Sequence, residues 1–425
     1  MTKITVVGAG FVGLTTAVCL ADIGNNVICS EIGESRVQNL RQGILPFYEP
    51  NLFEVLRRNL DENRLEFTTS SKKALSQAEY VFICLPTPAC SDGSVDTSFI
   101  DAFFRDFSDD FSKGTTVVMK STVPIGYGEA ISSLIESRNC TYVSNPEFLR
   151  EGSAINDFMY PDRIVIGSTS ISALEKIGEI YRPFNVPVIK TTTSSAELIK
   201  YASNGFLALK ISFINEIAAI CESARVDVRE VSSAVGLDPR IGPEFLRPGP
   251  GWGGSCFPKD TKALLSFADK NGIAFHTLRA AIEANKAQKH RVLQKILKSR
   301  GGADFKVCVL GLSFKAGTDD LRESPAIEIA MQLIEEGVDV VAYDPKAVEK
   351  DLSTQFSNFR TVQTWQEAAQ GADVIAILTE WDHFSTLDPR YVASIVRQRN
   401  VVDARNVLSK KVWEDAGFNF MGVGV

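Results

Sequence analysis

The segment 251–260 places a cysteine in surroundings that suit a nucleophile. It reads GWGGSCFPKD, so Cys256 follows two glycines and stands ahead of Lys259 and Asp260. A cysteine reacts as its thiolate, and nearby cations or backbone N–H groups lower the pKa of a thiol. Because a single cysteine is more often a small buried hydrophobe, the case for chemistry depends on what else the chain carries.

A second chemical signal stands at the start of the chain. The run GAGFVG (8–13) follows a short apolar strand pattern and opens a helical one. Its glycines permit a tight turn and a close approach of backbone to a pyrophosphate, which then rests on the helix N-terminus. Glu31 ends the next strand pattern, where a carboxylate binds ribose hydroxyls and repels a 2′-phosphate. We therefore predict a dinucleotide site that favours NAD over NADP, although Arg36 stands where it could meet a phosphate.

Two further pairs of polar residues occupy informative places. Lys200 and Asn204 are spaced to share one face of a long apolar helix. They need partners there unless the lysine lies on a solvated edge. Glu147 and Glu151 follow a strand end, where ligands bind in open α/β sheets. These glutamates could handle protons or order water, or they could be ordinary surface charges.

The C-terminal third repeats the strand–loop–helix pattern without a full glycine fingerprint. The loop after its first strand reads FKAGTDDLRESP (314–325). Lys315, Arg322 and Arg405 could hold a pyrophosphate by charge. We infer a second nucleotide-type ligand, the alternative being a degenerate unit that contributes only packing.

The sequence patterns around these residues predict an α/β fold. Short apolar runs alternate with helical patterns in both end regions, which is typical of βαβ units and doubly wound parallel sheets. Expected strands lie at 4–7, 27–30, 80–85, 116–120, 142–144, 164–167, 188–190, 306–310, 338–343, 372–378 and 400–403. A long spine helix from Ala196 to about Ala224, and more helix from Asp260 to about Leu297, lie in between. We predict two Rossmann-like domains (1–195 and 299–425) joined by a helical central, dimerisation domain (196–298).

Composition excludes several classes of function. The net charge of −7 argues against nucleic-acid binding. Eight scattered cysteines without paired spacing suit reduced thiols in a cytoplasmic protein. No signal peptide and no apolar stretch of about 18 residues is apparent, so no membrane association is expected. Three histidines and no Cys/His cluster make a metal site improbable.

Taken together, the motifs of this chain resemble those of the UDP-glucose/GDP-mannose dehydrogenase family over nearly its whole length. They are GAGFVG (8–13), PFYEP (46–50), LPTP (85–88), KSTVP (120–124), NPEFLREG (145–152), LIKYASN (198–204), RIG (240–242), GGSCFPKD (253–260), FKAGTDDLRESP (314–325) and DAR (403–405). NPEFLREG followed by PDRIV (161–165) is similar to the UDP-glucose branch. Glu31 stands where aspartate is commoner, and Phe11 where tyrosine is frequent.

The resemblance implies a four-electron oxidation of the sugar C6 alcohol to a carboxylate, with two NAD⁺ used in turn. It implies that Lys200, or a water held by Thr122 and Asp260, takes the hydroxyl proton. Cys256 would then form a thiohemiacetal that is oxidised to a thioester. Lys200 and Asn204 would stabilise the oxyanions, and water ordered by Glu147 and Asp260 would release the product.

The same resemblance assigns binding residues and an assembly. The NAD set comprises Gly8, Gly10, Phe11, Val12, Gly13, Glu31, Arg36, Leu85, Pro86, Thr87, Ser121, Thr122, Glu151, Lys259 and Arg322. The substrate set comprises Glu147, Phe148, Leu149, Arg150, Lys200, Asn204, Arg240, Phe245, Leu246, Gly249, Gly251, Gly253, Phe314, Lys315 and Arg405. Arg240 would reach the substrate across a subunit boundary, which requires at least a homodimer.

Three alternatives remain open. The same chemistry could act on another sugar nucleotide, such as a UDP-N-acetylhexosamine or GDP-mannose. A non-catalytic NAD sensor would be expected to have lost Cys256, Lys200 or Asp260, and all three are present. A two-electron hydroxyacid dehydrogenase would have no use for Cys256 or for the second α/β domain.

Overall fold

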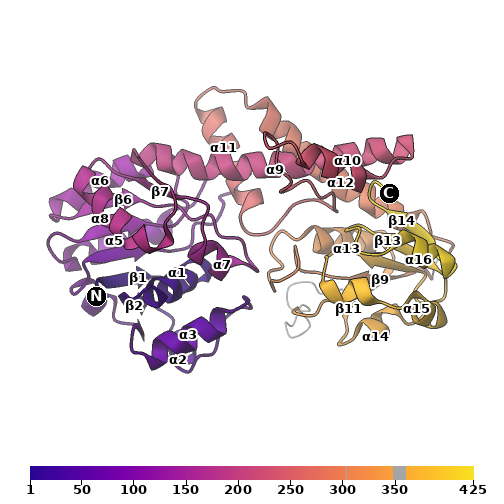
Figure 1. The fold of residues 1–425 in the computed structure, drawn as a ribbon, viewed down its shortest axis with the longest axis horizontal. Helices are drawn as coiled ribbons and strands as arrows, with labels where there is room; N and C mark the ends of the chain where they lie inside the picture. Colours follow the sequence, from indigo (N-terminus) through magenta and orange to yellow (C-terminus); the bar gives the residue numbers. More distant parts are fainter. Residues whose placement is uncertain (303, 348–359) are drawn as a thin grey trace. The chain divides into compact units, whose positions relative to one another are not determined.

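The computed structural model describes residues 1–302, 304–347 and 360–425 and divides into two compact units. The first unit comprises Met1–Ser203 with Lys262–Asn271, and the second comprises Asn204–Thr261 with Gly272–Val425. The division falls inside two helices, α9 (Thr193–Ala224) and α11 (Phe257–Lys270). Each unit is built on its own sheet (Figure 1). The three-domain division predicted from the sequence remains a prediction.

The first unit is a doubly wound sheet with strand order β3-β2-β1-β4-β5-β6-β7-β8. Its first six strands follow the order of a dinucleotide-binding fold, with the switch point between β1 and β4. α1 and α3 pack on one face and α5 and α6 on the other (Figure 1). The strands are β1 (Lys3–Val7), β2 (Asn26–Ser30), β3 (Leu65–Thr68), β4 (Tyr80–Ile83), β5 (Thr116–Met119), β6 (Thr141–Ser144), β7 (Ile164–Gly167) and β8 (Val188–Thr191). The helices are α1 (Phe11–Asp22), α2 (Glu34–Arg41), α3 (Leu52–Asp61), α4 (Ser71–Leu75), α5 (Ser98–Phe107), α6 (Tyr127–Ser137), α7 (Ala154–Met159) and α8 (Ile171–Tyr181).

One strand pair corrects the expectation of a wholly parallel sheet. β7 pairs with β6 in the antiparallel sense, through Ser144 and Gly167. The chain between β6 and β7 therefore leaves and re-enters the sheet at the same end of the strands, without crossing a face of the sheet. Both NPEFLREG and the residues that precede β7 consequently lie near the carboxyl end of β6, which is the ligand edge of such sheets.

The second unit contains a parallel sheet with strand order β11-β10-β9-β12-β13-β14. This is again the order of a dinucleotide-binding fold, with its switch point between β9 and β12. The two predicted Rossmann-like sheets and the long connecting helix are thus confirmed. The strands are β9 (Lys306–Leu310), β10 (Asp339–Tyr343), β11 (Arg360–Thr361), β12 (Val374–Ile377), β13 (Asn400–Asp403) and β14 (Asn419–Gly422). The helices are α10 (Val228–Gly236), α12 (His276–Leu297), α13 (Pro325–Glu335), α14 (Trp365–Ala369), α15 (Pro389–Ile395) and α16 (Lys410–Asp415).

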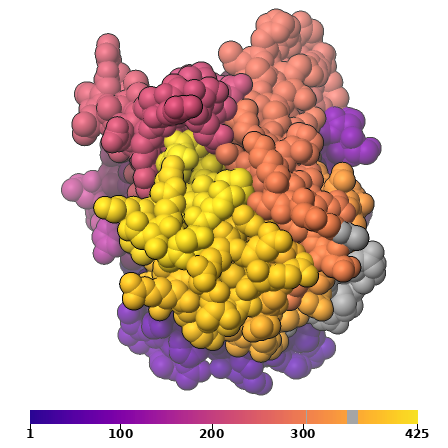
Figure 2. Space-filling model, turned by 90° about the vertical axis from the view of Figure 1, so that its right-hand side faces the viewer, coloured from indigo at the N-terminus to yellow at the C-terminus, as the bar shows by residue number. Residues whose placement is uncertain are grey.

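The end of the chain ties this second sheet to the helices of its own unit. Figure 2 shows the yellow C-terminal segment reaching the rose-coloured region of α9 and α10. Gly424 N donates to Glu222 Oε1 at 2.8 Å, and Val228 N donates to Gly424 O at 2.8 Å. A Cβ on Gly424 would lie 2.7 Å from Val228 Cγ1, so only glycine fits between these helices and the sheet.

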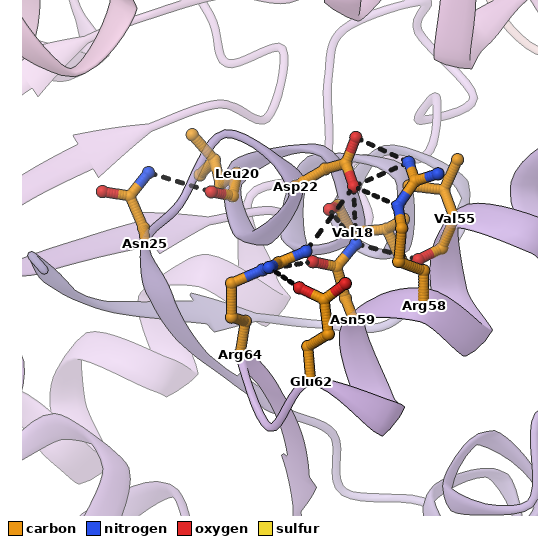
Figure 3. A network of polar contacts seen from close by, with 9 residues as sticks. All are labelled: Val18, Leu20, Asp22, Asn25, Val55, Arg58, Asn59, Glu62 and Arg64. Atoms are coloured by element: carbon orange, nitrogen blue, oxygen red, sulfur yellow. Dashed lines mark hydrogen bonds and ion pairs between the residues drawn. The ribbon is translucent and has the colours of Figure 1, made fainter.

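A polar network in the first unit holds α3 against α1 (Figure 3). Arg58 Nη2 and Asn59 Nδ2 donate to Asp22 Oδ1 at 2.8 and 3.1 Å. Asn59 is fully buried and also donates to Val55 O at 2.8 Å, while Arg64 Nε donates to Asn59 Oδ1 at 2.9 Å. These bonds satisfy a buried amide that would otherwise cost free energy, and they fix the helix that begins with the dinucleotide turn.

α9 corrects one expectation drawn from composition. Among the described residues it alone is long and apolar enough to cross a membrane by length and composition, although no such stretch was expected. Nevertheless, 44% of its most apolar window is buried inside the protein. Ile214 and Ala218 of α9 pack into a core cluster of the second unit, so protein contacts account for much of its apolar character.

Candidate active site

The turn 8–13 has the shape that a pyrophosphate requires. Gly8 has φ +95°, and a Cβ there would lie 2.8 Å from Cys84 O. A Cβ on Gly13 would overlap Gly8 O, whereas nothing lies within 4 Å of a Cβ on Gly10. Phe11 and Val12 are half-buried at the start of α1. The backbone is thus closely packed behind the turn and open in front of Gly10, which fits a dinucleotide at the helix N-terminus.

Glu31 supports this turn from the end of β2. Its Oε2 accepts from Ala9 N at 3.0 Å and its Oε1 from Gly33 N at 2.9 Å. Arg36 Nη1 lies 3.6 Å from Glu31 Oε2, and the arginine side chain is 47% exposed. The carboxylate of Glu31 therefore lies at the turn, as predicted. Arg36, which could favour NADP by binding a 2′-phosphate, lies beside it.

The ends of β4 and β5 bring other predicted cofactor residues together. Ser121 Oγ donates to Leu85 O at 2.7 Å, which joins the two strand ends. Thr87 and Thr122 are half-buried, and Pro86 is exposed. Because β4 adjoins β1 at the switch point, these residues lie at the edge where ligands of this fold bind.

Glu147 and Lys200 form a buried ion pair in the first unit. Lys200 Nζ lies 2.8 Å from Glu147 Oε1, and the side chains are 3% and 6% exposed. Glu147 Oε2 accepts from Leu149 N at 2.6 Å. Burial acts to raise the pKa of Glu147, but Lys200 and the hydrogen bonds outweigh it, so the pKa is lowered. The lysine of the long helix is thus not on a solvated edge, and its partner is one of the predicted glutamates.

The loop that carries Glu147 is anchored by residues outside it. Glu49, from the PFYEP motif, is buried and accepts from Gly152 N and Ala154 N, both at 2.7 Å. Glu151 is buried, whereas Arg150 is exposed and pairs with Asp157. Motifs that are far apart in the sequence therefore build one edge of the first unit.

Asp260 organises the polar cluster of the second unit. Its Oδ2 accepts from Asn204 Nδ2 at 2.6 Å, and its Oδ1 pairs with Lys259 Nζ at 2.6 Å. Asp260 is 1% exposed and Asn204 6% exposed. Cys256 immediately precedes α11, and its carbonyl accepts from Asp260 N at 2.9 Å. A group at a helix N-terminus experiences a field that favours its anionic form.

Buried amides hold the glycine-rich segment before Cys256. Asn285 Oδ1 accepts from Trp252 N at 2.8 Å and Asn285 Nδ2 donates to Trp252 O at 2.9 Å. Gln288 Nε2 donates to Gly249 O at 2.7 Å, and Asn215 Oδ1 accepts from Gly249 N at 2.8 Å. The roles of these amides were not predicted from the sequence. The signal that could have found them is a polar residue among the apolar positions of α9 and α12.

The predicted nucleotide loop of the second sheet also has a compact arrangement. Arg405 Nη2 donates to Phe314 O at 2.9 Å and Arg405 Nε to Leu378 O at 2.9 Å. Lys315 Nζ lies 5.8 Å from the centroid of the Phe314 ring. Arg322 is exposed and pairs with Asp320 at 2.6 Å. Arg405 and Phe314 are thus in direct contact, whereas Arg322 extends toward solvent.

The remaining predicted substrate residues differ in their surroundings. Leu246 is buried, and Phe245 has a left-handed backbone with φ 63°. Gly251, with φ +126°, would place a Cβ 2.8 Å from Asn285 Oδ1. The Arg240 side chain is 87% exposed and pairs with Asp238 at 2.6 Å. Arg240 is therefore directed to the surface of the protein.

Two cations near Glu147 were not identified from the sequence. Lys120 follows β5 and is 5% exposed; its Nζ donates to Asn145 Oδ1 at 3.4 Å, and burial lowers its pKa to about 8. The Arg163 guanidinium lies 4.1 Å from the centroid of the Phe148 ring, while Lys200 Nζ lies 5.6 Å from it. Lys120 belongs to the KSTVP motif and Arg163 to PDRIV, so their places in these motifs could have identified them as site residues. Within the described residues no cluster of His, Cys, Asp or Glu could hold a metal ion.

Sequence profiles of one family match the chain in three consecutive parts. The UDP-glucose/GDP-mannose dehydrogenase family matches by its NAD binding domain over residues 2–185 and its central domain over 194–287. Its UDP binding domain matches residues 308–410.

Individual proteins resemble the chain over its whole length. The UDP-glucose 6-dehydrogenase TuaD of Bacillus subtilis is 40% identical, and the alignment covers 100% of this chain and 93% of that protein. A UDP-glucose dehydrogenase structure from Pyrobaculum islandicum has a TM-score of 0.91 at 37% identity, with 100% and 98% coverage. A UDP-D-ManNAc dehydrogenase from Pyrococcus horikoshii has a TM-score of 0.87 at 27% identity, with 99% of each chain covered.

Proposed function

This chain belongs to the UDP-glucose/GDP-mannose dehydrogenase family, and we propose that it oxidises UDP-glucose at C6 to UDP-glucuronate. The net reaction consumes the alcohol, two NAD⁺ and one water, and yields the carboxylate, two NADH and three protons. The observation that carries the proposal is the contact of buried Asp260 with buried Asn204 of α9 and with half-buried Lys259, in the first turn of α11 directly after Cys256. Relatives named for UDP-glucose support this substrate.

The first oxidation needs a group that takes the hydroxyl proton of C6. NAD⁺, when bound, accepts a hydride from C6 in each of the two oxidations. Lys200, or a water held by Thr122 and Asp260, accepts this proton. The contact with Glu147 at 2.8 Å orients the Lys200 amine but also favours its charged form, so Lys200 accepts this proton only from its neutral state.

The second oxidation uses the thiol. The Cys256 thiolate adds to the aldehyde carbon and forms a C–S bond, and the aldehyde oxygen becomes an oxyanion that Lys200 and Asn204 stabilise. Loss of the second hydride converts this thiohemiacetal to a thioester. Water ordered by Glu147 and Asp260 then attacks the thioester, the C–S bond breaks, and the acid and the thiolate are released. A thiol is useful here because the tetrahedral adduct donates a hydride more readily than a free aldehyde does.

The binding residues are those that the resemblance to this family implies, and the two switch points support the choice. The turn 8–13, Glu31, Arg36, the loop 85–87, Ser121 and Thr122 hold NAD in the first unit, with Glu151, Lys259 and Arg322 as further contacts. Lys315 and Arg405 hold the diphosphate of UDP-glucose by charge. Phe314 belongs to the same substrate site, and Phe245 to Gly253 surround the sugar and the uridine. The Arg405–Phe314 hydrogen bond supports this assignment, because it orders the loop before any ligand arrives.

The proposed active enzyme is a homodimer. Arg240 reaches the substrate of a partner subunit, which is consistent with its exposure of 87%. Three large apolar side chains of α9 are exposed at a spacing of seven residues: Phe206, Phe213 and Ile220. Such a stripe is typical of a helix that packs against another helix. A cytoplasmic location remains a prediction, consistent with eight cysteines of which none forms a disulfide.

The test is the stoichiometry of NADH production. Purified protein receives limiting UDP-glucose and excess NAD⁺, and NADH is measured at completion. Two NADH per sugar are expected. One NADH would mean that the reaction ends at the aldehyde, and none would exclude UDP-glucose as the substrate.

Cys256→Ser tests the covalent step with the same assay. The variant is expected to form no acid while binding NAD⁺ as the wild-type protein does, because the thiol is not part of the turn 8–13. Near-normal acid production would contradict the thioester. UDP-N-acetylmannosamine and GDP-mannose serve as competing substrates, because a UDP-D-ManNAc dehydrogenase has the same fold.

A further inference from the structure

The loop that leads to Cys256 is packed without clearance against the loop after β9. Both loops belong to the second unit. A Cβ on Gly253 would overlap Glu323 O and would lie 2.7 Å from Pro325 Cδ. A Cβ on Gly254, where φ is +81°, would lie 2.8 Å from the Phe314 ring. Glycine is therefore required at both positions for steric reasons, because backbone and a ring occupy the space of a side chain.

The contact surface belongs to the loop that we propose binds the nucleotide. Arg405 holds the Phe314 carbonyl, and Phe314 N donates to Asp320 O at 3.2 Å. At the other end of the loop, Glu323 has a left-handed backbone with φ 49°, and its carbonyl accepts from Gly254 N at 3.4 Å. Ser324 Oγ donates to Leu312 O at 2.6 Å, which closes the loop on itself.

The path from this loop to the thiol is short. Only Ser255 stands between Gly254 and Cys256, and α11 begins directly after Cys256. On the far side, Trp252 is fixed by Asn285 through two hydrogen bonds. A displacement of Phe314 or of the Glu323 carbonyl therefore bears on the backbone next to Cys256, because the segment is held by Asn285 on one side and contacts both groups on the other.

We propose that loop 314–323 is a positioning element for Cys256: a nucleoside diphosphate bound to this loop sets the place of the thiol. The inference rests on the proposed function and adds a role for the nucleotide. The binding energy of a part of the substrate remote from C6 serves the thiol-dependent oxidation. Phe314 and Glu323 act on the reaction through Cys256 and are positioning residues in this respect.

The test uses uridine diphosphate alone, which carries no reacting carbon. The alkylation rate of Cys256 by iodoacetamide is measured by peptide mass spectrometry with and without saturating uridine diphosphate. The exposed Cys90 serves as an internal reference. Gly254→Ala and Phe314→Leu are compared with the wild-type protein, and Gly337→Ala is the matched control. Gly337 has a similar left-handed backbone, φ +75°, and nothing lies within 4 Å of its Cβ position.

Uridine diphosphate is expected to change the alkylation rate of Cys256 in the wild-type protein and in Gly337→Ala. The change should be absent in Gly254→Ala and in Phe314→Leu, with ligand saturation verified by calorimetry. With UDP-glucose, both variants should release aldehyde, so that NADH per sugar falls from two toward one. The rate of the second oxidation is expected to fall on the order of 10²-fold, the cost of a displacement of about 1 Å.

Two results would overturn the inference while leaving the proposed function intact. The first is an effect of uridine diphosphate on Cys256 that is equal in all four proteins, which would mean simple shielding by the ligand. The second is an unchanged yield of two NADH per sugar in both loop variants. Failure of the proposed function would be seen separately, as a wild-type protein that neither binds uridine diphosphate nor oxidises UDP-glucose.

Discussion

Lys200 Nζ and Glu147 Oε1 lie 2.8 Å apart in a pair from which water is almost excluded. Removing two charges from water costs free energy, and their attraction repays it only with good geometry and further hydrogen bonds. Glu147 has such a bond from Leu149 N. A buried pair of this kind is weak evidence for stability by itself, and it is consistent with the catalytic roles proposed for both residues.

Lys200→Met is expected to lower the free energy of unfolding by about 3–5 kcal/mol at pH 7.5, because it leaves the Glu147 carboxylate buried without its partner. The double variant Glu147→Gln/Lys200→Met should recover most of this loss, although both proteins should be inactive. Urea unfolding measures the difference. The wild-type pKa of Glu147 is lowered, so its contribution to stability is present above the ordinary carboxyl pKa and is lost as pH falls through the lowered value. A double variant no more stable than the single one would contradict the pairing argument.

Glu31→Ala is expected to weaken NAD binding much more than sugar-nucleotide binding. The substitution removes the acceptor of Ala9 N and frees Arg36 from its carboxylate at 3.6 Å. Arg36 can then meet a 2′-phosphate, so the preference for NAD over NADP should fall by about tenfold for each 1.4 kcal/mol lost. Kd values for both cofactors and for UDP-glucose provide the measurement. Equal losses for cofactor and sugar nucleotide would remove Glu31 from the ribose site.

Glu197 is expected to make stability depend on pH. It is buried, and its carboxylate accepts from Gly126 N at 2.6 Å and from Gly128 N at 2.8 Å. Burial raises its pKa to about 7. The folded state therefore binds a proton that the unfolded state has released, and the stability contributed by Glu197 falls as pH rises from the ordinary carboxyl pKa to about 7. Glu197→Gln should remove this part of the pH dependence, measured as the shift in unfolding midpoint between pH 5 and pH 7.5. An identical shift in both proteins would be the contrary result.

The fold was largely predictable because its strands are short apolar runs between helical patterns. Every strand expected from the sequence overlaps a strand in the structure, whereas β3, β11 and β14 were not predicted. β11 has two residues and β14 begins at an exposed asparagine, so neither presents a clear apolar run. The direction of β7 could not be predicted, because a buried strand of four apolar or small residues has the same sequence pattern in a parallel and in an antiparallel pair.

The partners in the candidate site were the part that the sequence could not reveal. Lys200 and Asn204 share a helix and were expected to need polar partners. Lys200 pairs with Glu147, which is 53 residues away, and Asn204 with Asp260, which is 56 residues away in the other direction. Helical spacing shows that two residues share a face, but only the packed chain shows what that face meets. The steric requirement for Gly253 and Gly254 is likewise invisible without Phe314 and Glu323 in place.

Phe213→Asp is expected to disrupt the proposed homodimer. Phe213 is 50% exposed in the middle of the stripe on α9, seven residues from both Phe206 and Ile220. A carboxylate there would have to lose its water when the helix packs against a partner, which costs several kcal/mol. Light scattering should therefore report the monomer mass for this variant. Phe99→Asp is the matched control, because Phe99 is 52% exposed on α5 of the first unit and outside the stripe.

Subunit mixing links the same interface to catalysis. Arg240→Ala and Cys256→Ser should each be inactive in the pure state. If Arg240 acts on the substrate of its partner, a mixed dimer has one site in which both residues are intact, and mixing the two variants should restore part of the activity. Adding Phe213→Asp to both chains should abolish this recovery, because the chains can no longer pair. Full activity of a monomeric Phe213→Asp protein would show instead that Arg240 is not needed from a second subunit and that the stripe on α9 has another role.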